Sequence, residues 1–339
     1  MTANDKWDGP LQILSLDGGG VKGLFAAAIL ANLERDLSVR IVDHFDLIAG
    51  TSTGGIIAIA LGLGLSPREI VNFYTLDAPK IFRTKKVISA CKHSVYRKHG
   101  PACLAAALRR QFGERRFGES HKRLVVPAYD LGRGAVHVFK TPHHERFRRD
   151  HRVPAWQVAM ATGAAPTYFP VFCEVDGIRL VDGGVWANNP AMVAVVEACG
   201  VLGAALNEVN VFSVGTTTEA VARPSCLNWG GLAQWAKPAT EVMLQAQCAA
   251  ANGMAELMLG KAHFLRVSPV VPAGMFDLDK CNTDSHLSYA STYSRELSPE
   301  FRCRFQGHKA REYVPLHTTL QSGETTPKPA NILGGNNAR

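Results

Sequence analysis

Short hydrophobic runs alternate with longer amphipathic stretches along most of the chain. Runs of strand length occupy residues 11–16, 45–49, 123–129, 135–139, 171–175, 178–181, 208–214 and 263–267. Helical spacing of apolar residues favours helices over 22–37, from Thr53 onward, and over 67–76, 101–112, 238–259 and 285–297. This alternation predicts an α/β fold in which a central, mostly parallel sheet is covered by helices on both faces.

Two segments depart from this alternation. Residues 78–118 are basic and irregular, which indicates either a lid over the active edge of the sheet or an ordinary connection. Residues 321–339 are dominated by Gly, Asn, Thr and Pro, so we expect a disordered tail. We therefore expect an N-terminal extension at 1–10 and one domain at 11–320, with its motif-bearing core at 11–214 and its completion at 215–320.

The composition provides enough apolar material for a large buried core. Of 339 residues, 46% are hydrophobic and 19% are charged. The longest apolar run, 56–65, is too short to span a bilayer, and the amino terminus lacks the plan of a signal peptide, so we expect a cytoplasmic protein. The 8 cysteines are spread singly without the spacing of a zinc site. We expect no disulfide framework, metal or cofactor.

The net charge favours an anionic partner. A formal charge of +8 favours a partner such as a phospholipid surface or a nucleotide. We expect transient, peripheral contact with the inner membrane surface and no binding of nucleic acid polymers. Solvated surface charge is the alternative interpretation of each basic cluster. The clusters comprise Arg83, Lys85, Lys86, Lys92, Arg97, Lys98, Arg146, Arg148, Arg149 and Arg152.

The first motif, LQILSLDGGGVKG at 11–23, delivers a glycine-rich turn from a strand to a helix start. The backbone N–H groups of Gly18, Gly19 and Gly20 are candidate donors to an oxyanion, because residues without side chains let a carbonyl approach closely. The same loop has the G-x-G-x-x-G spacing of a dinucleotide site, for which Asp43 is a candidate ribose ligand. A nucleotide-binding module therefore stays open as an alternative.

Two further motifs favour acyl chemistry. FDLIAGTSTG at 45–54 contains a G-x-S-x-G turn, which exposes Ser52 at a tight strand-to-helix bend as a nucleophile. VDGGVWANNP at 181–190 places Asp182 at the end of a strand as a candidate base, with Asn189 as N-cap and Pro190 as the first helical residue of the next helix. If they form a dyad, we expect the Ser52 hydroxyl about 2.6–3.2 Å from the Asp182 carboxylate.

Together with ATGAAPTYFP at 161–170, these motifs occur in the order of the patatin-like phospholipase family, which the chain closely resembles over about residues 11–214. The resemblance implies a three-layer fold and calcium-independent hydrolysis of fatty-acyl esters in membrane phospholipids, a phospholipase A type of activity. It also implies a Ser–Asp dyad without histidine, which carries over to Ser52 and Asp182, and an oxyanion hole, which carries over to Gly18, Gly19 and Gly20.

An α/β-hydrolase with a Ser-Asp-His triad is the enzymatic alternative. Four histidines follow Asp182 in the required chain order, and of these His308, in FQGHKAREY, is the best candidate. Against this reading, the nucleophile occurs after just one earlier clear strand, whereas that fold takes an oxyanion donor from a loop after its third strand. The other three are His263, His286 and His317.

A weaker resemblance concerns regulation. FKTPHHERF at 139–147 and GVWANNP at 184–190 are similar to the bacterial branch of patatin-like proteins, some of which are antiphage effectors activated by cyclic dinucleotides. That similarity makes His143, His144, Arg146 and Arg148 candidate contacts for such an activator. Plain loop surface is the alternative interpretation.

Overall fold

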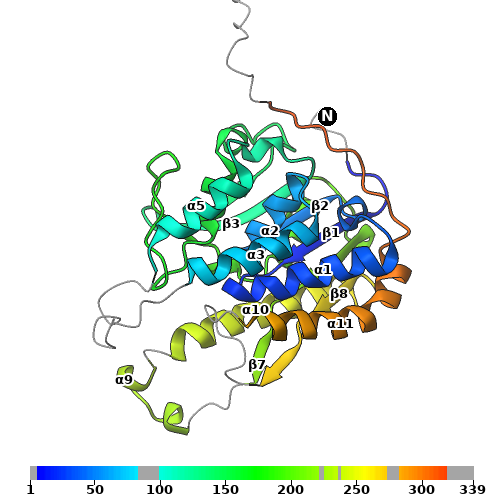
Figure 1. Cartoon of the computed structure of the whole chain (residues 1–339). Helices are drawn as coiled ribbons and strands as arrows, with labels where there is room; N and C mark the ends of the chain where they lie inside the picture. The colour runs from blue at the N-terminus through cyan, green and yellow to red at the C-terminus, as the bar shows by residue number, and fades with distance from the viewer. Residues whose placement is uncertain (1–5, 83–98, 221–224, 236–237, 273–281, 319–339) are drawn as a thin grey trace, which may run out of the picture.

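A central sheet organises the structure, a computed structural model that describes residues 6–82, 99–220, 225–235, 238–272 and 282–318 (Figure 1). Within these residues the sheet has 7 strands in the order β4-β3-β2-β1-β6-β8, with β5 paired to β3. Strands β1, β2, β3, β6 and β8 run parallel, and β4 and β5 run antiparallel to β3. The bounds are β1 Leu11–Leu16, β2 Leu47–Gly50, β3 Arg123–Asp130, β4 Ala135–Lys140, β5 Leu180–Asp182, β6 Val209–Val214 and β8 Phe264–Val267.

Helices follow most of the strands, as α/β connectivity requires. The longer ones are α1 Gly23–Leu37, α2 Thr53–Gly62, α3 Pro67–Ile81, α5 Pro101–Phe112, α6 Ala155–Thr162, α8 Ala191–Gly200, α10 Pro238–Leu259 and α11 Thr283–Arg304. Single turns form α7 Gly184–Ala187 and α9 Leu232–Trp235, and a separate parallel pair joins β7 Thr218–Ala220 to β9 Val270–Pro272.

The two faces of the sheet are covered by different helices. Side chains alternate between faces along a strand. On β1, Leu14 and Leu16 therefore pack in a core with α1, α2, α3 and α11, whereas Leu11 and Ile13 pack in a second core with α8 and α10. Figure 1 shows α1, α2 and α3 side by side over one face of the strands. The predicted fold, a mostly parallel sheet between two helical layers, is confirmed.

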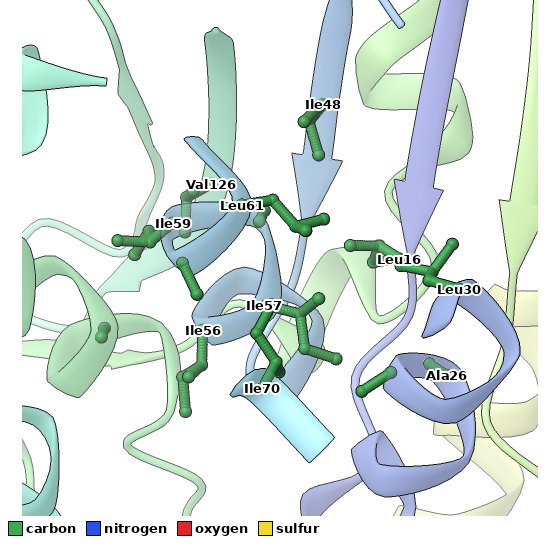
Figure 2. Packing of buried hydrophobic residues seen from close by; sticks show 14 of the residues in the cluster. Leu16, Ala26, Leu30, Ile48, Ile56, Ile57, Ile59, Leu61, Ile70 and Val126 are labelled. Atoms are coloured by element: carbon green, nitrogen blue, oxygen red, sulfur yellow. The ribbon is translucent and has the colours of Figure 1, made fainter. Parts of the chain in front are cut away.

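Helix α2 is buried on all sides because it contains no charged residue. Its Ile57 is fully buried beside Ile70 of α3, in the same core cluster as Leu16 and Ile48 of the strands (Figure 2). Burying one such side chain contributes about 1.5–3 kcal/mol. This packing fixes the start of α2, which is also where the chain turns at Ser52.

Several elements differ from the sequence-based expectation. Residues 171–175 form no strand, and only an isolated bridge joins Phe172 to Leu180. Helix α3 continues past the expected end at residue 76 because Ala78 and Ile81 are also buried on its apolar side. Helix α6 was not anticipated, since its short apolar sequence AWQVAMAT has no polar face.

The structure describes only parts of the predicted N-terminal extension and lid. Part of the predicted N-terminal extension joins the domain, because Trp7 is buried and its backbone N–H donates to Leu202 O at 3.0 Å. In the predicted lid, α5 packs into the larger core through Leu104, Leu108 and Phe112. Residues 83–98, which hold most of the predicted basic clusters, and the tail 319–339 lie outside the described residues. Among the described helices, none combines the length and the hydropathy needed to cross a bilayer.

Candidate active site

Strands β2 and β5 bring Ser52 and Asp182 together. Strand β4 occupies one edge of β3, so β2 and β5 share the other edge. Strand β2 runs parallel to β3 and pairs with it from Arg123 to Val125. Strand β5 runs antiparallel to β3 and pairs with it from Asp130 back to Ala128. The carboxyl ends of β2 and β5 therefore face each other, and each carries one of the two predicted residues.

The backbone at Ser52 is strained. Its φ of 54° and ψ of −122° are unusual for a residue with a side chain and are typical of a nucleophile at a sharp turn. The turn closes because Gly50 and Gly54 have no side chains: a Cβ at Gly54 would lie 2.2 Å from Leu16 O. The N–H of Ser52 donates to the Thr162 hydroxyl at 2.9 Å, which stabilises this conformation.

The Ser52 hydroxyl donates to Asp182 Oδ2 at 2.6 Å, the lower end of the expected range. Asp182 is buried, and burial raises the pKa of its carboxyl from 3.8 to about 6, although hydrogen bonds from Ser52 and Gly184 act in the opposite direction. A carboxylate with this pKa is ionised at neutral pH and is a stronger base than an exposed aspartate.

The loop after Asp182 holds the carboxylate in place. Gly184 N–H donates to Asp182 Oδ1 at 2.6 Å, and Asp182 N–H donates to Ala164 O at 3.0 Å. Helix α8 begins at Ala191 with Pro190 as its cap residue, one position later than expected, and Asn189 Oδ1 accepts from Ala191 N–H at 3.0 Å. The side chain of Asn189 therefore still caps this end of the helix, as the sequence predicted.

The glycine-rich loop lies beside Ser52. A Cβ at Gly18 would be 3.2 Å from Ser52 Cβ. The N–H of Gly18 already donates to Asn188 O at 2.9 Å, so it is occupied, whereas the N–H groups of Gly19 and Gly20 donate to no acceptor within the described part of the chain. Gly20 has a φ of 59°, which favours glycine. The candidate oxyanion donors therefore narrow to Gly19 and Gly20.

A buried ion pair that was not expected from the sequence anchors the same loop. Arg266, on β8, donates to both carboxylate oxygens of Asp17 and to Ser213 Oγ. The Asp17 carboxylate raises the pKa of Arg266 against the effect of burial, so the guanidinium stays charged. This pair fixes the residue immediately before Gly18. No local motif marks Arg266, because its partner lies 249 positions away.

The histidines of the alternative triad lie elsewhere. His308 Nε2 bonds Asp46 Oδ2 at 2.7 Å, immediately before β2 begins, whereas Ser52 follows the other end of that strand. His263 bonds Asn210, His317 bonds Glu145 O, and His286 bonds Asn282 O, the residue immediately before α11. The Asp182 carboxylate receives its hydrogen bonds from Ser52 and Gly184. The geometry therefore disfavours a triad.

The residues of the nucleotide-binding alternative are also separated. Asp43 precedes β2, at the end of the sheet opposite to the glycine-rich loop, and pairs with Arg40 at 3.8 Å. It cannot reach a ribose bound at Gly18–Gly20. In the part of the chain that the structure describes, no three His, Cys, Asp or Glu side chains are grouped closely enough to hold a metal ion.

The candidate regulatory loop separates into one buried and three accessible residues. The side chain of His143 is 0% exposed and bonds Glu197 Oε1 at 2.9 Å. Burial lowers the pKa of His143, which favours the neutral ring, and the bond to Glu197 gives this side chain a structural role. His144, Arg146 and Arg148 share a surface turn.

This turn and the dyad lie at different positions along β3. Thr141, just before the turn, bonds Leu124 near the start of β3. Asp182 pairs with Ala128, four residues further along the same strand.

Comparison with known proteins agrees with the geometry. The family model described as patatin-like phospholipase matches residues 14–195, more than half of the chain. The chain belongs to the patatin-like phospholipase family. The matched stretch of this patatin-like protein includes both Ser52 and Asp182 but ends before α10 and Arg266.

Three bacterial relatives, each named cGAMP-activated phospholipase, are similar to this patatin-like chain. The protein of Escherichia coli (strain TW11681) is 38% identical over 197 residues, 55% of this chain and 55% of that protein. The protein of Pseudomonas aeruginosa (strain BWHPSA011 / Pa011) is 33% identical over 255 residues, 74% of this chain and 76% of that protein. The protein of Vibrio cholerae serotype O1 (strain ATCC 39315 / El Tor Inaba N16961) is 35% identical over 230 residues, 62% of this chain and 65% of that protein. The chain thus spans little more than half the length of the first of these relatives.

Proposed function

We propose that this protein hydrolyses fatty-acyl esters of membrane phospholipids without calcium, using Ser52 as nucleophile and Asp182 as base. The observation that carries the proposal is the 2.6 Å hydrogen bond between the Ser52 hydroxyl and the buried Asp182 carboxylate. Membership of the patatin-like phospholipase family supports the substrate class. The strained turn at Ser52 and the two unoccupied glycine N–H groups support acyl transfer as the reaction type.

The reaction proceeds in two halves. Asp182 accepts the hydroxyl proton while Ser52 Oγ attacks the acyl carbonyl, and the oxyanion that forms accepts hydrogen bonds from Gly19 and Gly20. Collapse breaks the ester bond, and Asp182 returns the proton to the departing lysophospholipid oxygen. Asp182 then takes a proton from water, the resulting hydroxide attacks the acyl-serine, and Ser52 leaves with that proton as the free fatty acid forms.

The test uses the purified full chain on mixed phospholipid vesicles in the presence of a calcium chelator. We expect release of free fatty acid by the wild type and a loss of at least about 1,000-fold with Ser52→Ala or Asp182→Asn, since each removes a member of the dyad. Mass spectrometry of the lysolipids identifies the acyl position cleaved. Full hydrolysis by Asp182→Asn would show that the base has been misassigned.

Peripheral binding to the membrane follows from the same proposal. The net charge of +8 favours anionic lipids, and such binding weakens as salt screens the charges. Vesicle co-sedimentation is expected to be strong at low ionic strength with anionic lipid and weak with neutral lipid. Binding that is equal for both lipids would rule out the electrostatic contribution.

We also propose that a cyclic dinucleotide activates the enzyme, in a role in antiphage defence. Three bacterial relatives named cGAMP-activated phospholipase support the activation, and the resemblance of residues 139–147 and 184–190 to the bacterial branch of the family supports the role in defence. The candidate contacts are His144, Arg146 and Arg148, whose turn lies away from the dyad, so an activator bound there acts through a change in conformation. Vesicle hydrolysis measured with a panel of cyclic dinucleotides, for the wild type and Arg146→Ala/Arg148→Ala, tests the idea. Equal rates with and without every member of the panel contradict it.

A further inference from the structure

One side chain of α10 bonds both ends of the helical turn that follows Asp182. Gln247 Oε1 accepts from the N–H of Asn188 at 3.0 Å, and Gln247 Nε2 donates to Gly184 O at 2.9 Å. These backbone groups are four positions apart, the spacing that a hydrogen bond spans in an α-helix. The amide of Gln247 therefore bridges the turn and fixes the distance between its two ends.

Each end of the turn touches one half of the catalytic machinery. Gly184 N–H donates to the Asp182 carboxylate at 2.6 Å, so this end orients the base. Asn188 O accepts from Gly18 N–H at 2.9 Å, so the other end holds the glycine-rich loop. A Cβ at Gly18 would lie 2.3 Å from Asn188 Oδ1, which shows how closely the two loops are packed. The turn is thus the link between base and oxyanion donors.

Polar side chains set the position of α10 against this turn. Cys248 Sγ accepts from Asn188 Nδ2 at 3.2 Å, and Asn252 Oδ1 accepts from Asn189 Nδ2 at 2.6 Å. The buried apolar residues of the helix lie further along, at Ala251, Ala255 and Leu259. Hydrogen bonds therefore join α10 to the turn that follows Asp182, and Gln247 supplies two of them.

We propose that Gln247 is a positioning residue for the dyad, which holds Asp182 and the glycine-rich loop at the separation that acyl transfer requires. The inference rests on the proposed hydrolase function. An error of about 1 Å in such a position costs on the order of 100-fold in rate. Because Gln247 touches no reacting atom, its loss lowers kcat and leaves substrate binding nearly intact.

The pH profile separates positioning from a general loss of structure. The Asp182 pKa of about 6 depends on exclusion of water from the carboxylate. Shortening Gln247 opens the turn to water, so the acid limb of the profile is expected to move toward lower pH. A merely structural role reduces the amount of folded enzyme without moving the midpoint of that limb.

The experiment compares Gln247→Ala, Gln247→Met and Gln247→Glu with the wild type on a soluble short-chain ester. Ala removes both hydrogen bonds, Met keeps the length without them, and Glu keeps the acceptor but sets a carboxylate against Gly184 O. The control is Thr240→Ala, an exposed position on the same helix. For the three Gln247 variants we expect kcat to fall about 10- to 100-fold, KM to stay within about twofold and melting temperatures to stay near that of the control.

The outcomes distinguish this inference from the function on which it rests. If the wild type hydrolyses the ester and Ser52→Ala does not, while Gln247→Ala and Gln247→Met keep wild-type kcat and pH midpoint, the positioning role alone is overturned. A fall in kcat that follows the loss of folded protein, with an unmoved pH midpoint, overturns it equally. A wild type as inactive as Ser52→Ala overturns the proposed function and this inference together.

Discussion

The backbone N–H of Ser52 donates to the Thr162 hydroxyl at 2.9 Å, and that hydroxyl donates in turn to Pro127 O at 2.6 Å. One side chain from α6 thus joins the nucleophile turn to the strand along which Asp182 pairs. Thr162 is fully buried, so water cannot replace either bond. The first prediction follows from this contact.

Replacing Thr162 by Val keeps the shape but leaves the Ser52 N–H and the Pro127 carbonyl without their partner. A buried group without a partner costs about 1–3 kcal/mol, so we expect unfolding free energy to fall by that amount and kcat to fall with it. Thr162→Ser, which retains the hydroxyl, is the control and is expected to keep most activity. Chemical denaturation and ester hydrolysis measure the two effects. Wild-type values for Thr162→Val would show that the bond to Ser52 is dispensable.

The second prediction concerns pH. Asp182 must be ionised to accept the Ser52 proton, and burial raises its pKa to about 6. We therefore expect kcat/KM for a soluble ester to rise about tenfold per pH unit below pH 6 and to level off above it. Stopped measurements between pH 4.5 and 8, with fold checked by circular dichroism at each value, give the midpoint. A profile that is flat over this range argues against Asp182 as the base.

The same carboxylate makes stability depend on pH in the opposite sense. Because its pKa is about 6 in the folded protein and 3.8 in an ordinary setting, the folded state holds a proton that the unfolded chain releases. Folding stability therefore falls as pH rises from about 4 to about 6, by on the order of 3 kcal/mol.

The third prediction uses Asp182→Asn, which abolishes activity and also removes the loss of folding stability that ionisation of Asp182 causes. The variant is expected to be more stable than the wild type at pH 7–8 and equally stable at pH 4, because protonated Asp and Asn have nearly the same shape. Urea unfolding of both proteins at these pH values is the measurement. If the wild type is more stable than Asp182→Asn at pH 8, ionisation of Asp182 does not lower the free energy of unfolding.

The fourth prediction separates the dyad from a triad. His308 bonds Asp46, whose carboxylate also accepts from the N–H groups of Gln12 and Arg311. His308→Ala is expected to lower the unfolding free energy by about 1 kcal/mol, since two partners of Asp46 remain. Ester hydrolysis by the folded variant is expected to stay within about twofold of wild type. A collapse of kcat in stable, folded His308→Ala would restore the triad.

The fifth prediction uses two glycines with opposite surroundings. A Cβ at Gly54 would lie 2.2 Å from Leu16 O, a backbone atom that cannot move aside, whereas a Cβ at Gly100 would meet nothing within 4 Å. Gly54→Ala is therefore expected to cost about 3 kcal/mol or more and to displace Ser52. Gly100→Ala is expected to fold and hydrolyse ester as the wild type does. Soluble yield and melting temperature compare the pair, and equal stability would contradict the close approach at Gly54.

The features that could be predicted from the sequence are those with a local signal. The alternation of strand and helix patterns predicts the mostly parallel sheet, and the glycines on both sides of Ser52 and after Asp182 mark tight turns at strand ends. That β5 runs antiparallel to β3, so that its end meets the end of β2, has no such signal. The strand expected at 171–175 failed for a local reason too. Asp176 and Gly177 both have positive φ, and the turn they form separates these residues from β5.

Contacts between distant residues could not be predicted in the same way. Gln247 lies in an alanine-rich helix whose sequence gives no reason to single out one amide, and its role depends on how α10 packs. The position of His143 is a second example. It was selected because the segment FKTPHHERF resembles the bacterial branch of the family, whereas its hydrogen-bond partner Glu197 lies 54 positions further along the chain, on α8.

The pairing of the three-residue strand β5 with β3 sets the direction in which the Asp182 side chain points. Ala128 stands opposite Asp182 in the ladder, and a slip by a single residue would turn the carboxylate to the other face of the sheet. The turn that carries His144, Arg146 and Arg148 lies in the connection between β4 and α6 and takes no part in that pairing. In the proposed reaction the direction of the Asp182 side chain therefore depends on the alignment of two strands, and an activator bound at that turn would act from outside this ladder.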